Sequence, residues 1–178
     1  MQCATRPPKV EIVIGNRRFT ISLNEREAPV STAYFLQGVD TGVFDDATVF
    51  RIVNLNNQPP ERDTNIEVVQ MGLWNPDSGL RPVIAHESTR STGLLHRRGT
   101  VSLARYGPGA VYYSFFVCMR DEPVLDFGGS RQPDGLGFAA FGFVSKGFEA
   151  LQGLYREYAN TPEFLPTPVR FTSIRRVD

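Results

Sequence analysis

Short runs of β-branched and aromatic residues, ended by Gly, Pro or Asn, recur along the chain and constrain its fold more than any other feature. A hairpin is predicted over residues 10–23, where a Gly-Asn turn separates two such runs. Only 28–42 and 147–159 show helical spacing. Seven or eight strands with so few helices favour a mainly β fold, a closed antiparallel barrel with helices over its ends, over an alternating βαβ sheet. The further strand-like runs are 48–53, 66–74, 99–107, 112–119, 138–145 and 168–177.

The length of 178 residues predicts a single domain with a substantial core, which we expect over residues 9–178 behind a flexible tail, residues 1–8. The 19 basic and 19 acidic side chains balance, so net charge does not favour binding to nucleic acid or an anionic membrane surface. No apolar stretch reaches the length of a membrane span, and "MQCATRPPK" lacks the apolar middle of a signal peptide. The compartment stays open between the cytoplasm and, if a leader has been removed, the periplasm.

Residues that commonly hold a metal, a cofactor or a covalent intermediate are sparse. His86 and His96 are expected at the surface or in loops, Cys3 lies in the polar tail, and Cys118 is expected to be a small buried hydrophobe. The sequence contains no Gly-x-Ser-x-Gly elbow and no phosphate- or dinucleotide-binding glycine loop. We therefore expect no metal and no cofactor, and either binding or a reaction that needs only shape and electrostatics. Rotation about a prolyl peptide bond is such a reaction, with a barrier of about 18–20 kcal/mol set by amide resonance.

A permanent cation stands in the middle of one predicted strand, "TVFRIV", residues 48–53. Strand alternation predicts that Arg51 shares its face with Val49 and Val53. Burying an unpaired guanidinium is costly. Arg51 therefore needs either a carboxylate partner or an open groove that its head reaches while the valines cover its stem.

Six stretches, taken in order, resemble motifs of the cyclophilin family of peptidyl-prolyl cis–trans isomerases. They are "APVSTAYFL", "TVFRIV", "VVQMGLW", "GTVSLARYGPG", "SFFVC" and "LD…FAAFGFVSKGFEAL", and together they span roughly residues 9–176. The resemblance implies a closed eight-stranded antiparallel β-barrel capped by two α-helices, with a substrate groove on the outer wall. The "GFAAFG" segment is most similar to bacterial members.

The resemblance also implies which residues act. The catalytic positions fall on Arg51, Gln70 and Phe116. The substrate-binding positions fall on Ala104, Arg105, Leu125, Val68, Phe138 and Ser114. Arg51 would approach the proline, Gln70 would bond to the peptide, and Ala104 with the backbone of Arg105 would hold the residue before proline. Alternation along "YYSFFVC" predicts that Phe116 faces the groove while Phe115 fills the barrel. The implied partners are proline-containing peptides or unfolded chains, bound by a monomer.

Several positions depart from the family pattern. Glu67 stands where the family has a phenylalanine of the proline pocket, Ser114 replaces a glutamine, Val124 a tryptophan and Phe138 a histidine. Glu67 could pair with Arg51, or the loop could turn Val68 or Val69 toward the pocket instead.

We expect an isomerase that acts on Xaa-Pro bonds and so assists folding. The alternatives are a proline-peptide-binding module with weak or no isomerase activity, and an interaction domain that uses the insertion 127–137.

Overall fold

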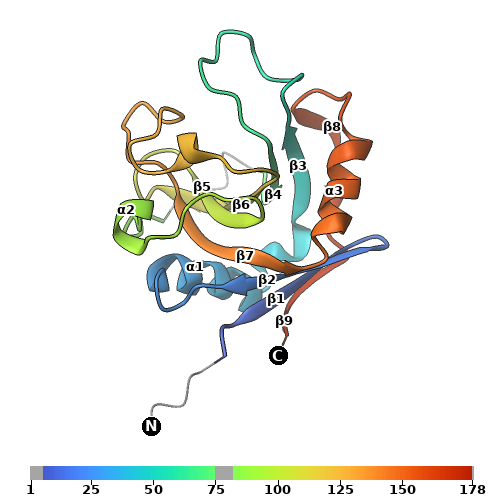
Figure 1. Cartoon of the computed structure of the whole chain (residues 1–178). Coiled ribbons are helices and arrows are strands. Elements are labelled where there is room, and N and C mark those ends of the chain that lie inside the picture. Colours follow the sequence, from blue (N-terminus) through green and yellow to red (C-terminus); the bar gives the residue numbers. More distant parts are fainter. Residues whose placement is uncertain (1–5, 75–81, 178) are drawn as a thin grey trace.

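The computed structural model describes residues 6–74 and 82–177, and within them the chain forms one curled antiparallel sheet (Figure 1). Cys3 and most of the tail expected over residues 1–8 lie outside the described residues. In this part of the chain, nine strands follow the order β8-β3-β4-β6-β5-β7-β2-β1-β9. The strands are β1 (Lys9–Ile14), β2 (Arg17–Leu23), β3 (Thr48–Val53), β4 (Val68–Gly72), β5 (Thr100–Arg105), β6 (Val111–Cys118), β7 (Ala139–Lys146), β8 (Phe164–Arg170) and β9 (Ser173–Val177).

The last chain segment closes the sheet on itself. β8 pairs with β3 and β9 pairs with β1, and only Phe171 and Thr172 separate them. The prediction of one closing strand over residues 168–177 is wrong in this detail. The N–H of Phe171 donates to the carbonyl oxygen of Ala47 (2.9 Å) and that of Thr172 to the carbonyl oxygen of Val13 (2.7 Å), so the pairing changes sides there. The two pieces form one bent strand, and the predicted eight-stranded barrel is confirmed in that form.

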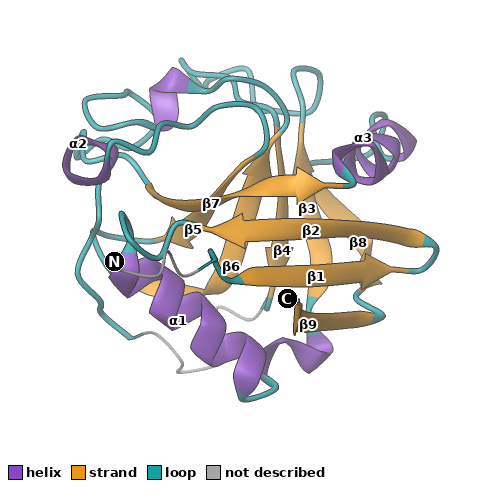
Figure 2. Cartoon of the chain, turned by 60° about the horizontal axis from the view of Figure 1, so that its bottom comes forward, coloured by secondary structure: helices purple, strands orange, loops and turns teal. Residues whose placement is uncertain are grey.

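Two helices cover the barrel, as predicted. α1 (Pro29–Asp40) begins with proline at its first turn, where the missing N–H costs nothing, and packs against β7 and β9. α3 (Phe148–Glu157) packs against β2, and Figure 2 shows the two helices at opposite sides of the strands. Short helical turns follow as α2 (Thr89–Thr92), η1 (Val43–Asp46) and η2 (Pro123–Leu125). None of the helices in the described residues is long and apolar enough to cross a membrane.

Apolar side chains gather in two clusters, one inside the barrel and one on its outer wall. Phe115 belongs to the barrel interior, whereas Phe116 belongs to the outer cluster, as the alternation along β6 predicts. Met71, which follows Gln70, also fills the interior. The outer cluster consists of Val53, Ile66, Val68, Ala104, Phe116, Cys118, Leu125 and Phe138. A buried apolar patch outside the barrel needs a cover, and the loops before β4 and β7 supply it.

A β-bulge in β3 decides where Arg51 points. The register with β4 shifts between Val49, which faces Met71, and Arg51, which faces Gln70. Val49 and Ile52 therefore both lie in the barrel interior although they are three residues apart. The prediction that Arg51 shares a face with Val49 is wrong, because the extra residue Phe50 reverses the alternation. The bulge turns Arg51 outward, toward the outer apolar cluster.

Candidate active site

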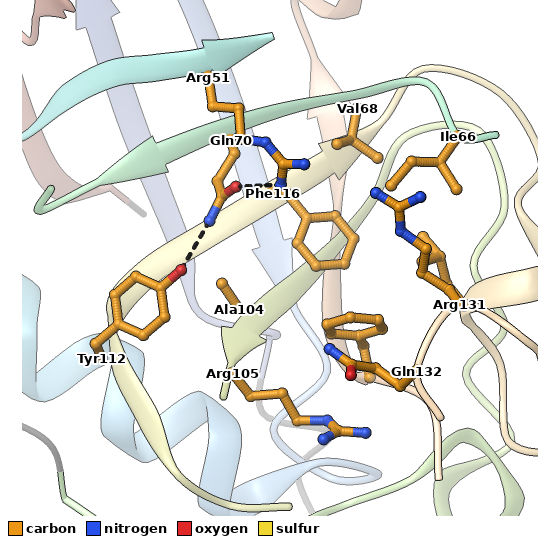
Figure 3. A pocket seen from close by; sticks show the side chains of 12 residues that line it. Arg51, Ile66, Val68, Gln70, Ala104, Arg105, Tyr112, Phe116, Arg131 and Gln132 are labelled. Atoms are coloured by element: carbon orange, nitrogen blue, oxygen red, sulfur yellow. Dashed lines mark hydrogen bonds between the residues drawn. The ribbon is translucent and has the colours of Figure 1, made fainter. Parts of the chain in front are cut away.

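A pocket opens on the outer wall of the barrel, between neighbouring strands and two loops (Figure 3). β3 to β6 supply its back and one side, and the segment 125–138 supplies the other side. Twelve of the described residues line it: Arg51, Ile66, Val68, Gln70, Ala104, Arg105, Tyr112, Phe116, Leu125, Arg131, Gln132 and Phe138.

Gln70 is fixed by hydrogen bonds at both ends of its amide. Its Oε1 accepts from Arg51 Nη1 at 3.1 Å, and its Nε2 donates to the hydroxyl oxygens of Tyr112 (3.1 Å) and Ser114 (3.0 Å), as Figure 3 shows for the first two partners. Ser114 is buried beneath Gln70 and does not line the pocket. The carbonyl end of Gln70 is thereby turned toward the guanidinium.

Arg51 also has a carboxylate partner, which the sequence did not reveal. Glu163, in the connection between α3 and β8, accepts at Oε2 from Arg51 Nε (3.2 Å) and Nη2 (2.8 Å). The two side chains are only 16% and 13% exposed. Burial opposes ionisation of Glu163, but hydrogen bonds and charge from Arg51, and then from Arg62, outweigh it and lower the pKa of the carboxyl.

The ion pair leaves part of the Arg51 guanidinium available. Within the described residues, three of its five N–H donors are engaged, one by Gln70 and two by Glu163. The ring of Phe164 lies 5.1 Å from the guanidinium carbon and adds a cation–π contact. Arg51 is thus held on three sides, and it lines the pocket with two N–H groups that none of the described residues engages. Both conditions set by its place in a strand, a partner and an open groove, are met.

The floor of the pocket is apolar and closely packed. The rings of Phe116 and Phe138 meet edge to face, with centroids 5.4 Å apart. Leu125 is buried in the same apolar cluster, and Val68 completes the floor. These are four of the positions that the resemblance assigned to the groove, and the structure brings them together.

Glu67 points away from the pocket. Its carboxylate accepts a hydrogen bond from the Tyr155 hydroxyl and pairs with Arg120 Nη1 at 3.3 Å. Ile66 takes the place in the lining that the sequence assigned to Glu67, because Ile66, two residues before β4 begins, continues the alternation of Val68 and Gln70 along the pocket. The carboxylate therefore neither fills the proline pocket nor pairs with Arg51.

The side chain of Arg105 holds the insertion 127–137 against the pocket. Its guanidinium is 1% exposed and donates to both oxygens of Asp134, each at 2.8 Å, and to the carbonyl oxygen of Gly137, also at 2.8 Å. The hydrogen bond from Arg105 lowers the pKa of Asp134 to about 2. The resemblance assigned Arg105 a role through its backbone, and the side chain has this second one. The insertion is thus a wall of the pocket.

A polar network supports the aromatic floor from below. His96 lies in a loop, as expected, and is buried there, with only 2% of its surface exposed. Its Nδ1 is hydrogen-bonded to Asp126 Oδ1 (2.7 Å) and its Nε2 to Ser102 Oγ (2.9 Å), and the ring stacks under Phe116 with centroids 6.1 Å apart. Cys118 is buried, as predicted, and burial raises the pKa of its thiol. Among the described residues, no three or more His, Cys, Asp or Glu side chains form a group that could hold a metal ion.

Eight of the nine predicted site residues thus line one pocket, and Ser114 supports it from beneath. Ile66 could have been found from its alternation with Val68 and Gln70. The other residues that sequence reasoning missed belong to segments without a regular pattern, or have a polar role that only their contacts reveal. They are Tyr112, Arg131, Gln132 and Glu163.

Comparisons with known proteins agree with this geometry. The family described as "Cyclophilin type peptidyl-prolyl cis-trans isomerase/CLD" matches residues 9–175. Peptidyl-prolyl cis-trans isomerase cyp18 of Streptomyces antibioticus is 26% identical over 82% of this chain and 81% of its own length. Peptidyl-prolyl cis-trans isomerase A of Dickeya dadantii is 29% identical over 82% of this chain and 70% of its own length.

Solved structures share the fold. The crystal structure of a cyclophilin type peptidyl-prolyl cis-trans isomerase of Cryptosporidium parvum superposes with a TM-score of 0.73 at 17% identity, covering 97% of this chain and 98% of its own. A crystal structure of that protein in the presence of the dipeptide Ala-Pro gives a TM-score of 0.72 at 17% identity, covering 96% of this chain and 99% of its own. These matches establish that the barrel and its capping helices have the same arrangement.

Proposed function

This chain belongs to the family of cyclophilin type peptidyl-prolyl cis-trans isomerases, and we propose that Arg51, Gln70 and Phe116 carry out the isomerisation of Xaa-Pro bonds in peptides or unfolded chains bound in the pocket. The observation that carries these assignments is the fixed guanidinium of Arg51 beside an apolar floor. The same floor suits a prolyl ring, which is apolar and has no N–H to satisfy.

The substrate is oriented by the two sides of the pocket. The prolyl ring packs on Phe116, Phe138 and Leu125, and the residue before proline lies along the edge formed by Ala104 and Arg105. This pose brings the prolyl nitrogen toward the two N–H groups of Arg51 that are not engaged by Gln70 or Glu163.

Catalysis follows from a difference between the planar and the twisted amide. In the planar bond the nitrogen lone pair is delocalised, and as the bond rotates the lone pair becomes localised on nitrogen and accepts a hydrogen bond. An N–H of Arg51 aimed at that nitrogen stabilises the twisted state more than either planar state, which is the condition for a faster reaction. Each 1.36 kcal/mol of this difference gives about a tenfold gain in rate. The positive charge of Arg51 is present at every ambient pH.

The departures from the family pattern leave this machinery in place. Glu67 faces away from the pocket, and Phe138 adds an aromatic wall. The reading as a binding module with little activity therefore loses the observations that motivated it. An interaction domain built on the insertion 127–137 is likewise not favoured, because the insertion forms part of the pocket.

The test is exchange NMR on a short peptide with an Ala-Pro bond, comparing the wild type with Arg51→Ala. We expect kcat/KM to fall at least tenfold, about 1.4 kcal/mol of lost transition-state stabilisation. Arg26→Ala, which removes an exposed arginine outside the pocket, is the control and keeps full activity. A folded Arg51→Ala protein with wild-type rates would falsify the role of Arg51. A wild type that binds the peptide without accelerating exchange is instead a binding module.

A further inference from the structure

Three arginines line the pocket, and one of them has no carboxylate partner. Arg51 is paired with Glu163 and Arg105 with Asp134. Arg131 makes no ion pair with any of the described residues, and its guanidinium donates one hydrogen bond, from Nη1 to the carbonyl oxygen of Thr64 at 2.8 Å. A half-buried cation without a counter-ion in a substrate pocket is unusual, since buried charges are normally paired.

The nearby carboxylates are already engaged by other groups. Glu163 is shared by Arg51 and Arg62, and Glu122 accepts from Arg120 Nε (2.8 Å) and from the backbone N–H of Glu67 (2.7 Å). Burial, followed by the positive charges of Arg62 and Arg51, lowers the pKa of Arg131 to about 10. The surroundings of Arg131 therefore favour the arrival of an anion.

Arg131 is held in place and aimed at one side of the pocket. Its backbone N–H donates to the carbonyl oxygen of Val124 at 3.1 Å, and its head group is tied to Thr64, two residues before Ile66. In Figure 3 the guanidinium lies beside Ile66, on the side of the floor away from Ala104. In the proposed pose the residue before proline lies along Ala104, so the chain that follows the proline leaves past Arg131.

We propose that Arg131 is a specificity residue that selects peptides with a carboxylate side chain in the residue after the proline. A guanidinium pairs with a carboxylate through two parallel N–H···O hydrogen bonds, and after its bond to Thr64 the Arg131 head keeps enough donors for such a pair. The inference rests on the proposed function, because it places the substrate by the isomerase pose. It adds that the enzyme favours Pro-Glu or Pro-Asp sequences.

The probe is a set of three peptides capped at both ends, so that only side chains carry charge. They are acetyl-Ala-Ala-Pro-Glu-amide, its isostere acetyl-Ala-Ala-Pro-Gln-amide, and acetyl-Glu-Ala-Pro-Gln-amide, in which the carboxylate precedes the proline. We expect the wild type to isomerise the Pro-Glu peptide about threefold to tenfold faster, as kcat/KM, than the Pro-Gln peptide, the range of a half-buried charge pair. The preference shrinks toward one as salt is raised. For the peptide with Glu before the proline, we expect a smaller gain in kcat/KM over the acetyl-Ala-Ala-Pro-Gln-amide peptide.

Arg131→Gln identifies the residue. We expect the Pro-Glu to Pro-Gln ratio of this variant to fall to about one, whatever its absolute rate. Arg26→Gln makes the same change of net charge outside the pocket and is expected to keep the wild-type ratio. A ratio near one in the wild type, or a preference that survives in Arg131→Gln, overturns the inference while leaving the isomerase assignment intact. If the wild type accelerates exchange in none of the three peptides, the proposed function itself is overturned.

Discussion

Replacing Glu163 by glutamine tests whether Arg51 must be held in order to act. Glu163 accepts two hydrogen bonds from Arg51 and further ones from Arg62, and the glutamine of Glu163→Gln would keep the shape and one acceptor while losing the charge. Loss of one partner from a buried pair costs about 3–5 kcal/mol, and an exposed pair contributes about 0–1 kcal/mol. The Arg51–Glu163 pair is mostly buried but borders an open groove.

We therefore expect Glu163→Gln to lose an intermediate amount of transition-state stabilisation, about 1–2 kcal/mol. The loss is not larger because the retained amide oxygen and Gln70 still hold part of the guanidinium. At 1.36 kcal/mol for each factor of ten, kcat/KM falls about fivefold to thirtyfold. The loss appears in kcat more than in KM, since the bond from Arg51 to the prolyl nitrogen strengthens only as the amide twists.

The assay is exchange NMR at several concentrations of an Ala-Pro peptide, with kcat and KM separated. Glu163→Asp keeps the charge and is expected to recover part of the loss. Glu157→Gln breaks a surface pair with Arg17 and is the matched control, with wild-type rates expected. A folded Glu163→Gln enzyme with unchanged or raised kcat refutes the reasoning. A raised kcat would mean that Glu163 weakens the hydrogen bond donated by Arg51, and that this effect on the rate is larger than the benefit of holding Arg51 in position.

Two further expectations concern pH and the insertion. Glu163 and Asp134 both have lowered pKa values in the fold, the latter at about 2 through its bond from Arg105. A carboxyl of this kind stabilises the fold above its unfolded pKa and loses that effect only as pH falls through the lower folded value. We therefore expect kcat/KM to stay level from pH 8 down to about 5, and a decline above pH 5 would contradict it. Gly137 has φ of +66°, and a Cβ at this position would lie 2.6 Å from backbone atoms of Leu125 and Asp126. We therefore expect Gly137→Ala to lower the free energy of unfolding by about 1–3 kcal/mol, measured by denaturant titration. Gly135→Ala, at φ of +68° with open space around it, is the control and should cost less, and equal costs would remove the steric argument.

Regular elements could be predicted because their periodicity is local. The hairpin of β1 and β2, the helix after Pro29 and the strand around Arg51 all follow from spacing and turn residues. The bulge at Phe50 and the break at Phe171 could not, because each depends on how the strand meets two different neighbours. A single residue inserted by a bulge reverses the faces that alternation assigns. The prediction that Val49 shares a face with Arg51 therefore failed, whereas Arg51 does point to a groove.

The site divides in the same way. Phe116 and Val68 lie on strands, so alternation together with motif order placed them on the wall of the pocket. Glu163 and Arg131 lie outside the strands and are 112 and 80 positions along the chain from Arg51. Their importance comes from contacts that only the folded chain creates, and no local pattern marks a residue for such a contact. Arg51 did carry a signal, since a charge within a strand demanded a partner that the sequence could not name.

The pocket keeps an apolar lining and a fixed Gln70 where the sequence around them departs from the family pattern. Ile66 supplies the apolar contact that Glu67 lacks, and Tyr112 joins Ser114 in receiving the amide of Gln70. These exchanges do not account for the positive charge of the arginines that line the pocket. Of the three arginines that line the pocket, Arg51 is paired with Glu163 and Arg105 with Asp134, and Arg131 has no ion-pair partner among the described residues. An apolar floor alone would accept any proline, and the role proposed for Arg131 makes the charge of the residue after the proline a second criterion for binding.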